Sequence, residues 1–158
     1  MEVISRAQAA TCEFLNAQKP QKNLVQCKNL QNHQLQQHWI PPEEGWVKVN
    51  SDASQGATME KGGLGLIIRD HLGRPLRAVS EPCSFQSIRL GEALALRAGM
   101  IQALNDGWTK VRFESDNLEM ISYLTRQQCN IPLEVPPVIN DVFHLSPSFT
   151  LVSFSHIS

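Results

Sequence analysis

The sequence predicts an α/β domain built on a mixed five-stranded sheet, with three antiparallel strands, two further parallel strands and helices on the faces of the sheet. Two observations lead to this fold class. Three strand-like segments joined by short turns come first, which is the pattern of antiparallel hairpins. Helical and strand patterns then follow one another, as they do where right-handed crossovers place strands in parallel. The predicted order of elements is β-β-β-α-β-α-α-β.

The three antiparallel strands come from the first half of the predicted domain. Apolar and polar residues alternate over 46–52, WVKVNSD, as they do along a strand. A second apolar run, GGLGLIIRD at 62–70, ends at the turn residues 71–73, and PLRAVSEPC at 75–83 returns as the third strand. The turn between the second and third runs indicates a hairpin.

The clearest helix is predicted at 87–107. Leu96 and Met100 belong to an apolar stripe with helical spacing, Ser87 is a candidate N-cap, and Gly107 is expected to end the helix. The remaining predicted elements are a strand, two helices and a last strand, at 109–116, 117–127, 133–146 and 148–158.

One face of the second helix is expected to be buried. Leu118, Ile121 and Leu124 share that face by their spacing, so we expect all three to contact the core.

The compact domain is expected to span 45–158, and two other segments precede it. Residues 1–17 have apolar side chains near helical spacing and predict a short amphipathic helix. Residues 18–44 are rich in Gln and Asn and poor in large apolar groups, which is typical of a linker.

Charge and cysteine content exclude several classes of protein. The 158 residues carry 14 Lys and Arg against 15 Asp and Glu, so no general positive field attracts nucleic acid. No Cys-x-x-Cys pair occurs, so neither a zinc site nor a redox motif is indicated. The sequence shows no secretory signal and no apolar run long enough to span a membrane. We therefore expect an intracellular protein, in the nucleus or the cytoplasm.

Three carboxylates are expected to meet at one edge of the sheet. Asp52 ends the first strand and Asp116 ends the fourth, and ligands of open α/β sheets gather at the carboxyl ends of parallel strands. Glu92, in the first turns of the long helix, can point to the same place. Three carboxylates would repel one another unless a hard cation joined them, and Mg²⁺ takes this role. Two such ions about 4 Å apart would hold a phosphodiester for attack by water.

Four segments make the chain recognisable: GWVKVNSDAS, GGLGLIIRDHLGRPL, GEALALRAGMIQALNDGWTKVRFESDN and FTLVSFSHIS. Together they closely resemble the plant reverse-transcriptase-like branch of the ribonuclease H family, over roughly residues 39–158. The resemblance implies the ribonuclease H-like fold and Mg²⁺-dependent endonucleolytic cleavage of the RNA strand of an RNA–DNA hybrid, with Mn²⁺ as an alternative ion. Asp52, Glu92 and Asp116 match the first three of the four family carboxylates. By the resemblance, Asp52 bridges both ions, and Glu92 and Asp116 hold one ion and orient the attacking water.

The fourth family carboxylate has no match in this sequence. In the family it lies on a final helix beyond the last strand, whereas the sequence ends at Ser158, just after FSHIS. Asp141 belongs to the preceding helical segment and is not a convincing replacement. We therefore expect a domain that lacks its C-terminal helix. If the coding sequence continues past Ser158 into that helix, this sequence is a fragment; if it does not, we expect weak or absent activity and a marginally stable sheet edge.

Substrate contacts are expected beside the first carboxylate. Ser54 and Gln55 follow Asp52 and could contact phosphate or 2′-hydroxyl groups, and a loop without a role is the competing interpretation. Gly63, in the glycine-rich second strand, would let a sugar-phosphate backbone approach, but a bulge or a packing requirement is an equal alternative.

Several other residues are expected to be structural. Glu114 is predicted to point away from Asp116 and to lie at the surface. His156 could act as a proton shuttle, but a histidine at a strand end is more often structural. Ser115 lacks the surroundings of a hydrolase nucleophile. Trp39 and the other tryptophans are expected to pack rather than to stack on bases.

Three functions follow in order of preference. The first is a monomeric RNA–DNA hybrid ribonuclease. The second is a catalytically degenerate, retroelement-derived module that binds nucleic acid without cleaving it. The third is an interaction scaffold, which is supported only by the predicted N-terminal helix.

Overall fold

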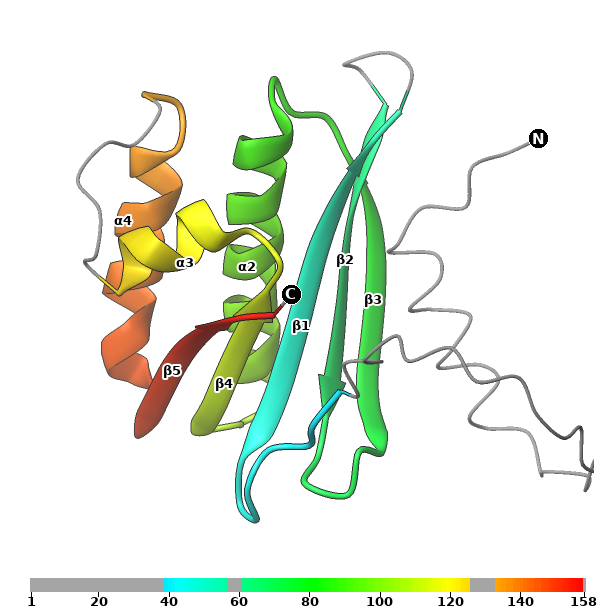
Figure 1. Ribbon diagram of the computed structural model, residues 1–158, viewed down its shortest axis with the longest axis vertical. Coiled ribbons are helices and arrows are strands. Elements are labelled where there is room, and N and C mark those ends of the chain that lie inside the picture. Colours follow the sequence, from blue (N-terminus) through cyan, green and yellow to red (C-terminus); the bar gives the residue numbers. More distant parts are fainter. Residues whose placement is uncertain (1–38, 57–60, 126–132, 158) are drawn as a thin grey trace, which may run out of the picture.

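The protein is described by a computed structural model, in which residues 39–56, 61–125 and 133–157 can be followed (Figure 1). The strands are β1 (Val47–Gln55), β2 (Gly62–Arg69), β3 (Pro75–Cys83), β4 (Lys110–Ser115) and β5 (Leu151–His156). The helices are α2 (Ile88–Asn105), α3 (Leu118–Leu124) and α4 (Pro136–Leu145), and a 3₁₀ turn η1 (Ser146–Ser148) follows α4. This order confirms the predicted succession of strands and helices.

The sheet has the order β3-β2-β1-β4-β5. The β1–β2 and β2–β3 pairs are antiparallel, and β4 lies parallel to both β1 and β5. The predicted mixed sheet is therefore confirmed. The predicted hairpin is confirmed as well, because Asp70 accepts hydrogen bonds from the backbone of Leu72 and Arg74, and Gly73 has a φ of 76° that suits glycine.

One apolar core lies between the sheet and the described helices, which all stand to one side of the sheet in Figure 1. Val49 of β1 and Phe113 of β4 are fully buried in it, against Leu96 and Met100 of α2 and Val142 of α4. The stripe predicted on the long helix therefore faces the sheet.

Helix α2 begins and ends at residues that the sequence identifies. The Ser87 side chain accepts a hydrogen bond from the backbone of Leu90, and Gly107, just beyond the helix, adopts a φ of 78°. Gly91 allows the helix to approach β1. A Cβ atom there would lie 2.6 Å from the Phe85 ring and 3.0 Å from Cβ of Ala53.

The prediction for the buried face of α3 is partly wrong. Leu118 is 58% exposed, whereas Ile121 and Leu124 are buried as expected, together with Met120 and Tyr123. Leu118 is the first residue of α3, next to the N-cap, so it lies where the helix leaves the sheet edge.

Most of the N-terminal region lies outside the described residues. The helix predicted at 1–17 and the greater part of the linker predicted at 18–44 therefore stay predictions. Residues 39–44, the end of that linker, contact the sheet: Trp39 donates to Asn50, and Glu43 pairs with Arg112. Within the described ranges, no helix is long and apolar enough to cross a membrane.

Candidate metal centre

The prediction that Asp52 ends the first strand is wrong, because Asp52 lies within β1, on the part that extends beyond its partner β4. The ladder between β1 and β4 has its last pair at Asn50 and Glu114, whereas β1 continues to Gln55 and pairs there only with β2. Asp52 therefore stands beside an open space at the carboxyl end of β4.

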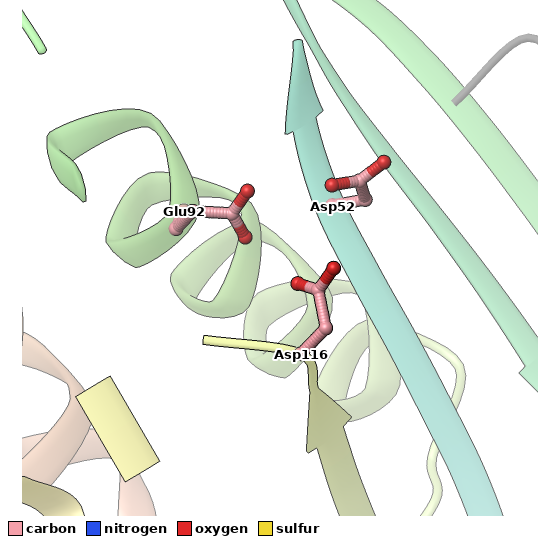
Figure 2. A group of neighbouring side chains, drawn as sticks. All are labelled: Asp52, Glu92 and Asp116. Atoms are coloured by element: carbon pink, nitrogen blue, oxygen red, sulfur yellow. The ribbon is translucent and has the colours of Figure 1, made fainter. Parts of the chain in front are cut away.

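Asp116 directly follows β4 and occupies that space. The chain turns here because the Ser115 hydroxyl accepts a hydrogen bond from the backbone of Asn117, whose own side chain caps α3 by accepting from Met120. Asp116 is exposed, and Figure 2 shows its carboxylate directed towards Asp52 and Glu92.

Glu92 reaches the site from α2. The side chain is only 6% exposed, and its Oε1 accepts a hydrogen bond of 3.3 Å from the backbone N–H of Ala53, the residue after Asp52. The close approach at Gly91 brings this part of α2 against β1. The neighbouring glycine thus places Glu92 next to Asp52.

The three carboxylates converge on one point. One oxygen from each of Asp52, Glu92 and Asp116 lies within 4.8 Å of the other two. The pKa of Glu92 is raised from 4.5 to about 8, first by burial, then by the charge of Asp52 and less by that of Asp116. Oε2 of Glu92 is buried and accepts no hydrogen bond within the described part of the chain.

A divalent cation fits this arrangement. The donors are all carboxylate oxygens, which suit Mg²⁺ or Mn²⁺, and the like charges that raise the pKa of Glu92 would be offset by a cation between them. The predicted meeting of Asp52, Glu92 and Asp116 is thus present in the structure. Asp141 lies elsewhere and forms an ion pair of 2.8 Å with Arg97.

The residues predicted to contact substrate lie on the same edge. Ser54 and Gly63 are register partners on β1 and β2, and Gln55 at the end of β1 is exposed. A Cβ atom on Gly63 would make only ordinary contacts, at 3.4 Å and 3.6 Å, so packing does not require this glycine. Gly62 differs, because its Cβ would lie 2.9 Å from the Phe85 ring and from two backbone oxygens. Contact of Ser54, Gln55 and Gly63 with substrate stays a prediction.

His156 lies beside the carboxylates. Its Nε2 is 3.2 Å from the backbone oxygen of Asp116, and the ring is exposed. The parallel pairing of Ser115 with His156 produces this contact. The sequence could not show it, because the pairing joins segments far apart in the chain.

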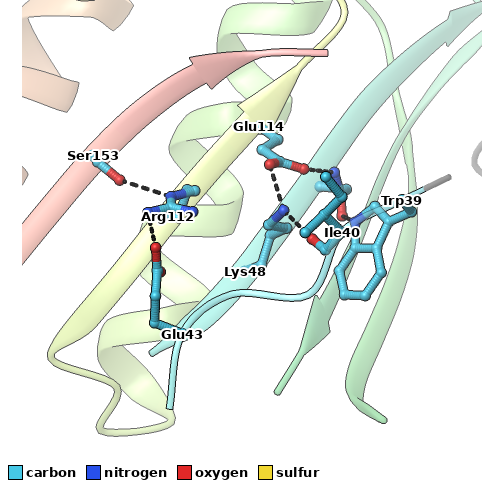
Figure 3. Close-up of polar contacts among 8 residues, drawn as sticks. Trp39, Ile40, Glu43, Lys48, Arg112, Glu114 and Ser153 are labelled. Carbon is cyan, nitrogen blue, oxygen red and sulfur yellow. Dashed lines mark hydrogen bonds and ion pairs between the residues drawn. The ribbon is translucent and has the colours of Figure 1, made fainter. Parts of the chain in front are cut away.

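The prediction that Glu114 lies at the surface is wrong. Its side chain is 8% exposed and forms an ion pair with Lys48, itself 4% exposed, at 2.6 Å (Figure 3). Asn50 donates to the other oxygen of Glu114 at 3.1 Å. Alternation places residues two apart on the same face of a strand, so it gives no reason for Glu114 to point away from Asp116. Trp39 and Ile40 cover the face of the sheet on which Glu114 lies.

Three solved structures that share this fold are ribonucleases H. RNase H1 from the archaeon Halobacterium salinarum NRC-1 matches with a TM-score of 0.67 and 16% identity, over 72% of this chain and 86% of the other. The N-terminal RNase H domain of rv2228c from Mycobacterium tuberculosis matches with a TM-score of 0.65 and 13% identity, over 71% of this chain and 81% of the other. LC11-RNase H1, solved in complex with an RNA/DNA hybrid, matches with a TM-score of 0.62 and 16% identity, over 70% of this chain and 84% of the other.

Sequence comparison gives the family. No curated protein matches the chain. The profile described as reverse transcriptase-like matches residues 50–158, which is more than half of the chain and includes Asp52, Glu92 and Asp116. With the ribonuclease H fold and the carboxylate cluster in place, the chain belongs to the reverse transcriptase-like family.

Proposed function

We propose that the protein is a Mg²⁺-dependent ribonuclease that cleaves the RNA strand of RNA–DNA hybrids internally, with Mn²⁺ as a substitute ion. The observation that carries this proposal is the convergence of Asp52, Glu92 and Asp116, from β1, α2 and the end of β4, at the edge of a ribonuclease H fold. The RNA/DNA hybrid bound by LC11-RNase H1 supports the substrate class.

The three carboxylates would hold the ions. When bound, two ions would supply an activated water and would stabilise the leaving 3′-oxygen. Asp52 extends from β1 beside Glu92 and Asp116 in Figure 2, and the family resemblance makes it the candidate shared ligand. Glu92, fixed to β1 through the N–H of Ala53, would accept a proton or hold the water in place once it is ionised.

The chain's own contacts to the hybrid would be local. Of the described arginines, Arg74, Arg77, Arg89, Arg97 and Arg112 each form an ion pair with a carboxylate, which reduces their attraction for phosphate. Ser54, Gln55 and Gly63 are the proposed neutral contacts on the edge next to Asp52. We further propose a monomeric, intracellular protein of the plant, retroelement-derived branch, on the motifs quoted above.

A cleavage assay tests the proposal. The full chain is incubated with Mg²⁺ and an end-labelled RNA–DNA hybrid, with single-stranded RNA and duplex RNA as comparison substrates. We expect internal cuts in the RNA of the hybrid alone, and a loss of about 10²-fold or more in Asp52→Asn, as expected when a metal ligand is removed. The control is Asp141→Asn, which removes an equal charge outside the cluster. Equal cleavage by both variants would contradict the metal centre.

A module that binds hybrids without cleaving them is the second candidate. It is favoured by the number of carboxylates, since three meet among the described residues, whereas the family resemblance assigns four. Hybrid binding measured by fluorescence anisotropy, with no cleavage in Mg²⁺ or Mn²⁺, would support it. A chain that neither binds nor cleaves the hybrid would contradict both candidates.

A further inference from the structure

A network of buried and partly buried polar groups joins β1 and β4 at the end of their ladder. Trp39 Nε1 donates to Asn50 Oδ1 at 3.1 Å, and Asn50 Nδ2 donates to Glu114 Oε2 at 3.1 Å. Glu114 Oε1 pairs with Lys48 Nζ at 2.6 Å, and Lys48 donates to the backbone oxygen of Ile40. The network thus starts and ends on the segment Trp39–Ile40, which crosses the face of the sheet opposite to the helices (Figure 3).

The Trp39 ring fixes this segment on the sheet. Nζ of Lys48 and Cζ of Arg69 each lie 5.0 Å from the centroid of the ring, a distance at which cations interact favourably with an indole. Trp39 therefore lies over the Lys48 end of the ion pair, and its indole N–H donates to Asn50, which in turn donates to Glu114. A buried ion pair is stable only when its remaining donors and acceptors are satisfied in this way.

The position of the network relative to the site is its most informative feature. Asn50 and Glu114 form the last register pair of the β1–β4 ladder. Beyond it, β1 and β4 share no backbone pairing, yet Asp52 and Asp116 must lie at a fixed separation to share a cation. Asp52 is two residues after Asn50 on the same strand, so both side chains leave β1 on one face.

We propose that the Trp39–Asn50–Glu114–Lys48 network is a positioning device that sets the separation of Asp52 and Asp116. The side-chain bridge between Asn50 and Glu114 joins the two strands at the last point where their backbones pair. The segment Trp39–Ile40 keeps water from competing for that bridge. This inference rests on the proposed function, because it concerns the same metal centre.

Calorimetric titration of the full chain with Mg²⁺ tests the device without requiring cleavage. Asn50→Leu removes both hydrogen bonds of Asn50 at nearly constant volume, and Trp39→Phe keeps an aromatic ring but removes the indole N–H together with the five-membered ring that carries it. Groups that support metal ligands change affinity by about 10- to 100-fold, so we expect a Kd about 10-fold higher for Asn50→Leu and about 3-fold higher for Trp39→Phe. In cleavage, kcat should fall while KM for the hybrid stays constant.

The control separates positioning from stability. Ile139→Val shortens a side chain that is 2% exposed in the core on α4, so it lowers stability without touching the network. We expect its Mg²⁺ affinity to equal that of the unsubstituted chain. If Trp39→Phe and Asn50→Leu bind Mg²⁺ with the affinity of the unsubstituted chain, the positioning role is overturned. If Asn50→Leu does not fold, the affinity of Trp39→Phe alone decides. An unsubstituted chain that binds no Mg²⁺ would overturn the metal centre, and the positioning role with it.

Discussion

Glu92→Gln is expected to stabilise the metal-free protein in alkaline solution and to weaken its response to Mg²⁺. The substitution keeps the shape of the side chain and the oxygen that accepts from Ala53, and it removes the charge that burial and Asp52 oppose. In the folded protein the pKa of Glu92 is raised from 4.5 to about 8. Between these values the folded state binds a proton that the unfolded state has lost, so the stability of the unsubstituted protein falls as the pH rises through this range.

The magnitude follows from that pKa. The full difference corresponds to about 5 kcal/mol at 1.36 kcal/mol per pKa unit. Asp116 is exposed, so water screens part of the repulsion, and about 1–3 kcal/mol is the expected gain for Glu92→Gln. At about 2–8 °C per kcal/mol for domains of this size range, the melting temperature should rise by several degrees near pH 9 and hardly at all near pH 5.

Thermal melts with a chelator present, at acidic and alkaline pH, measure this effect. Mg²⁺ should then raise the melting temperature of the unsubstituted protein more than that of Glu92→Gln, because a ligand stabilises the state that binds it. Asp141→Asn is the control, since it removes a carboxylate that is paired with Arg97 and lies outside the cluster. A melting temperature of Glu92→Gln that shows the same pH dependence as the unsubstituted protein would refute the reasoning.

Three further comparisons of variants test other parts of the structure by urea unfolding. Gly91→Ala should destabilise the protein by about 1–3 kcal/mol despite the better helix propensity of Ala, because its Cβ would meet the Phe85 ring at 2.6 Å. Phe85→Leu should restore part of the lost stability. A Gly91→Ala variant more stable than the unsubstituted protein would contradict the close approach of α2 to Phe85. Lys48→Met should lower the free energy of unfolding by about 3–5 kcal/mol, because it leaves Glu114 charged and buried. The double variant Lys48→Met with Glu114→Gln should recover much of that loss. A double variant as unstable as Lys48→Met would count against the ion pair as the cause. Leu118→Ser should cost less than about 0.5 kcal/mol, whereas Ile121→Ala should cost about 2–5 kcal/mol, and similar values would show that Leu118 is buried after all.

The sequence predicted the elements whose signals are local. Alternation in β1, the turn at Gly73, and the Ser87 and Gly107 signals at the two ends of α2 each depend on residues close together in the chain. The carboxylate cluster also followed, because the β-α-β order implies that the strands of Asp52 and Asp116 are parallel, although β1 runs past Asp52 to Gln55.

The tertiary structure alone decided which side chains are covered and how far apart they lie. Alternation directs Lys48 and Glu114 to one face of the sheet, but only the crossing of that face by Trp39 and Ile40 buries them. The separation of Asp52 from its partners depends on where the β1–β4 ladder stops. Both are contacts between segments distant in sequence, and a periodic pattern along one segment has no information about what packs against it.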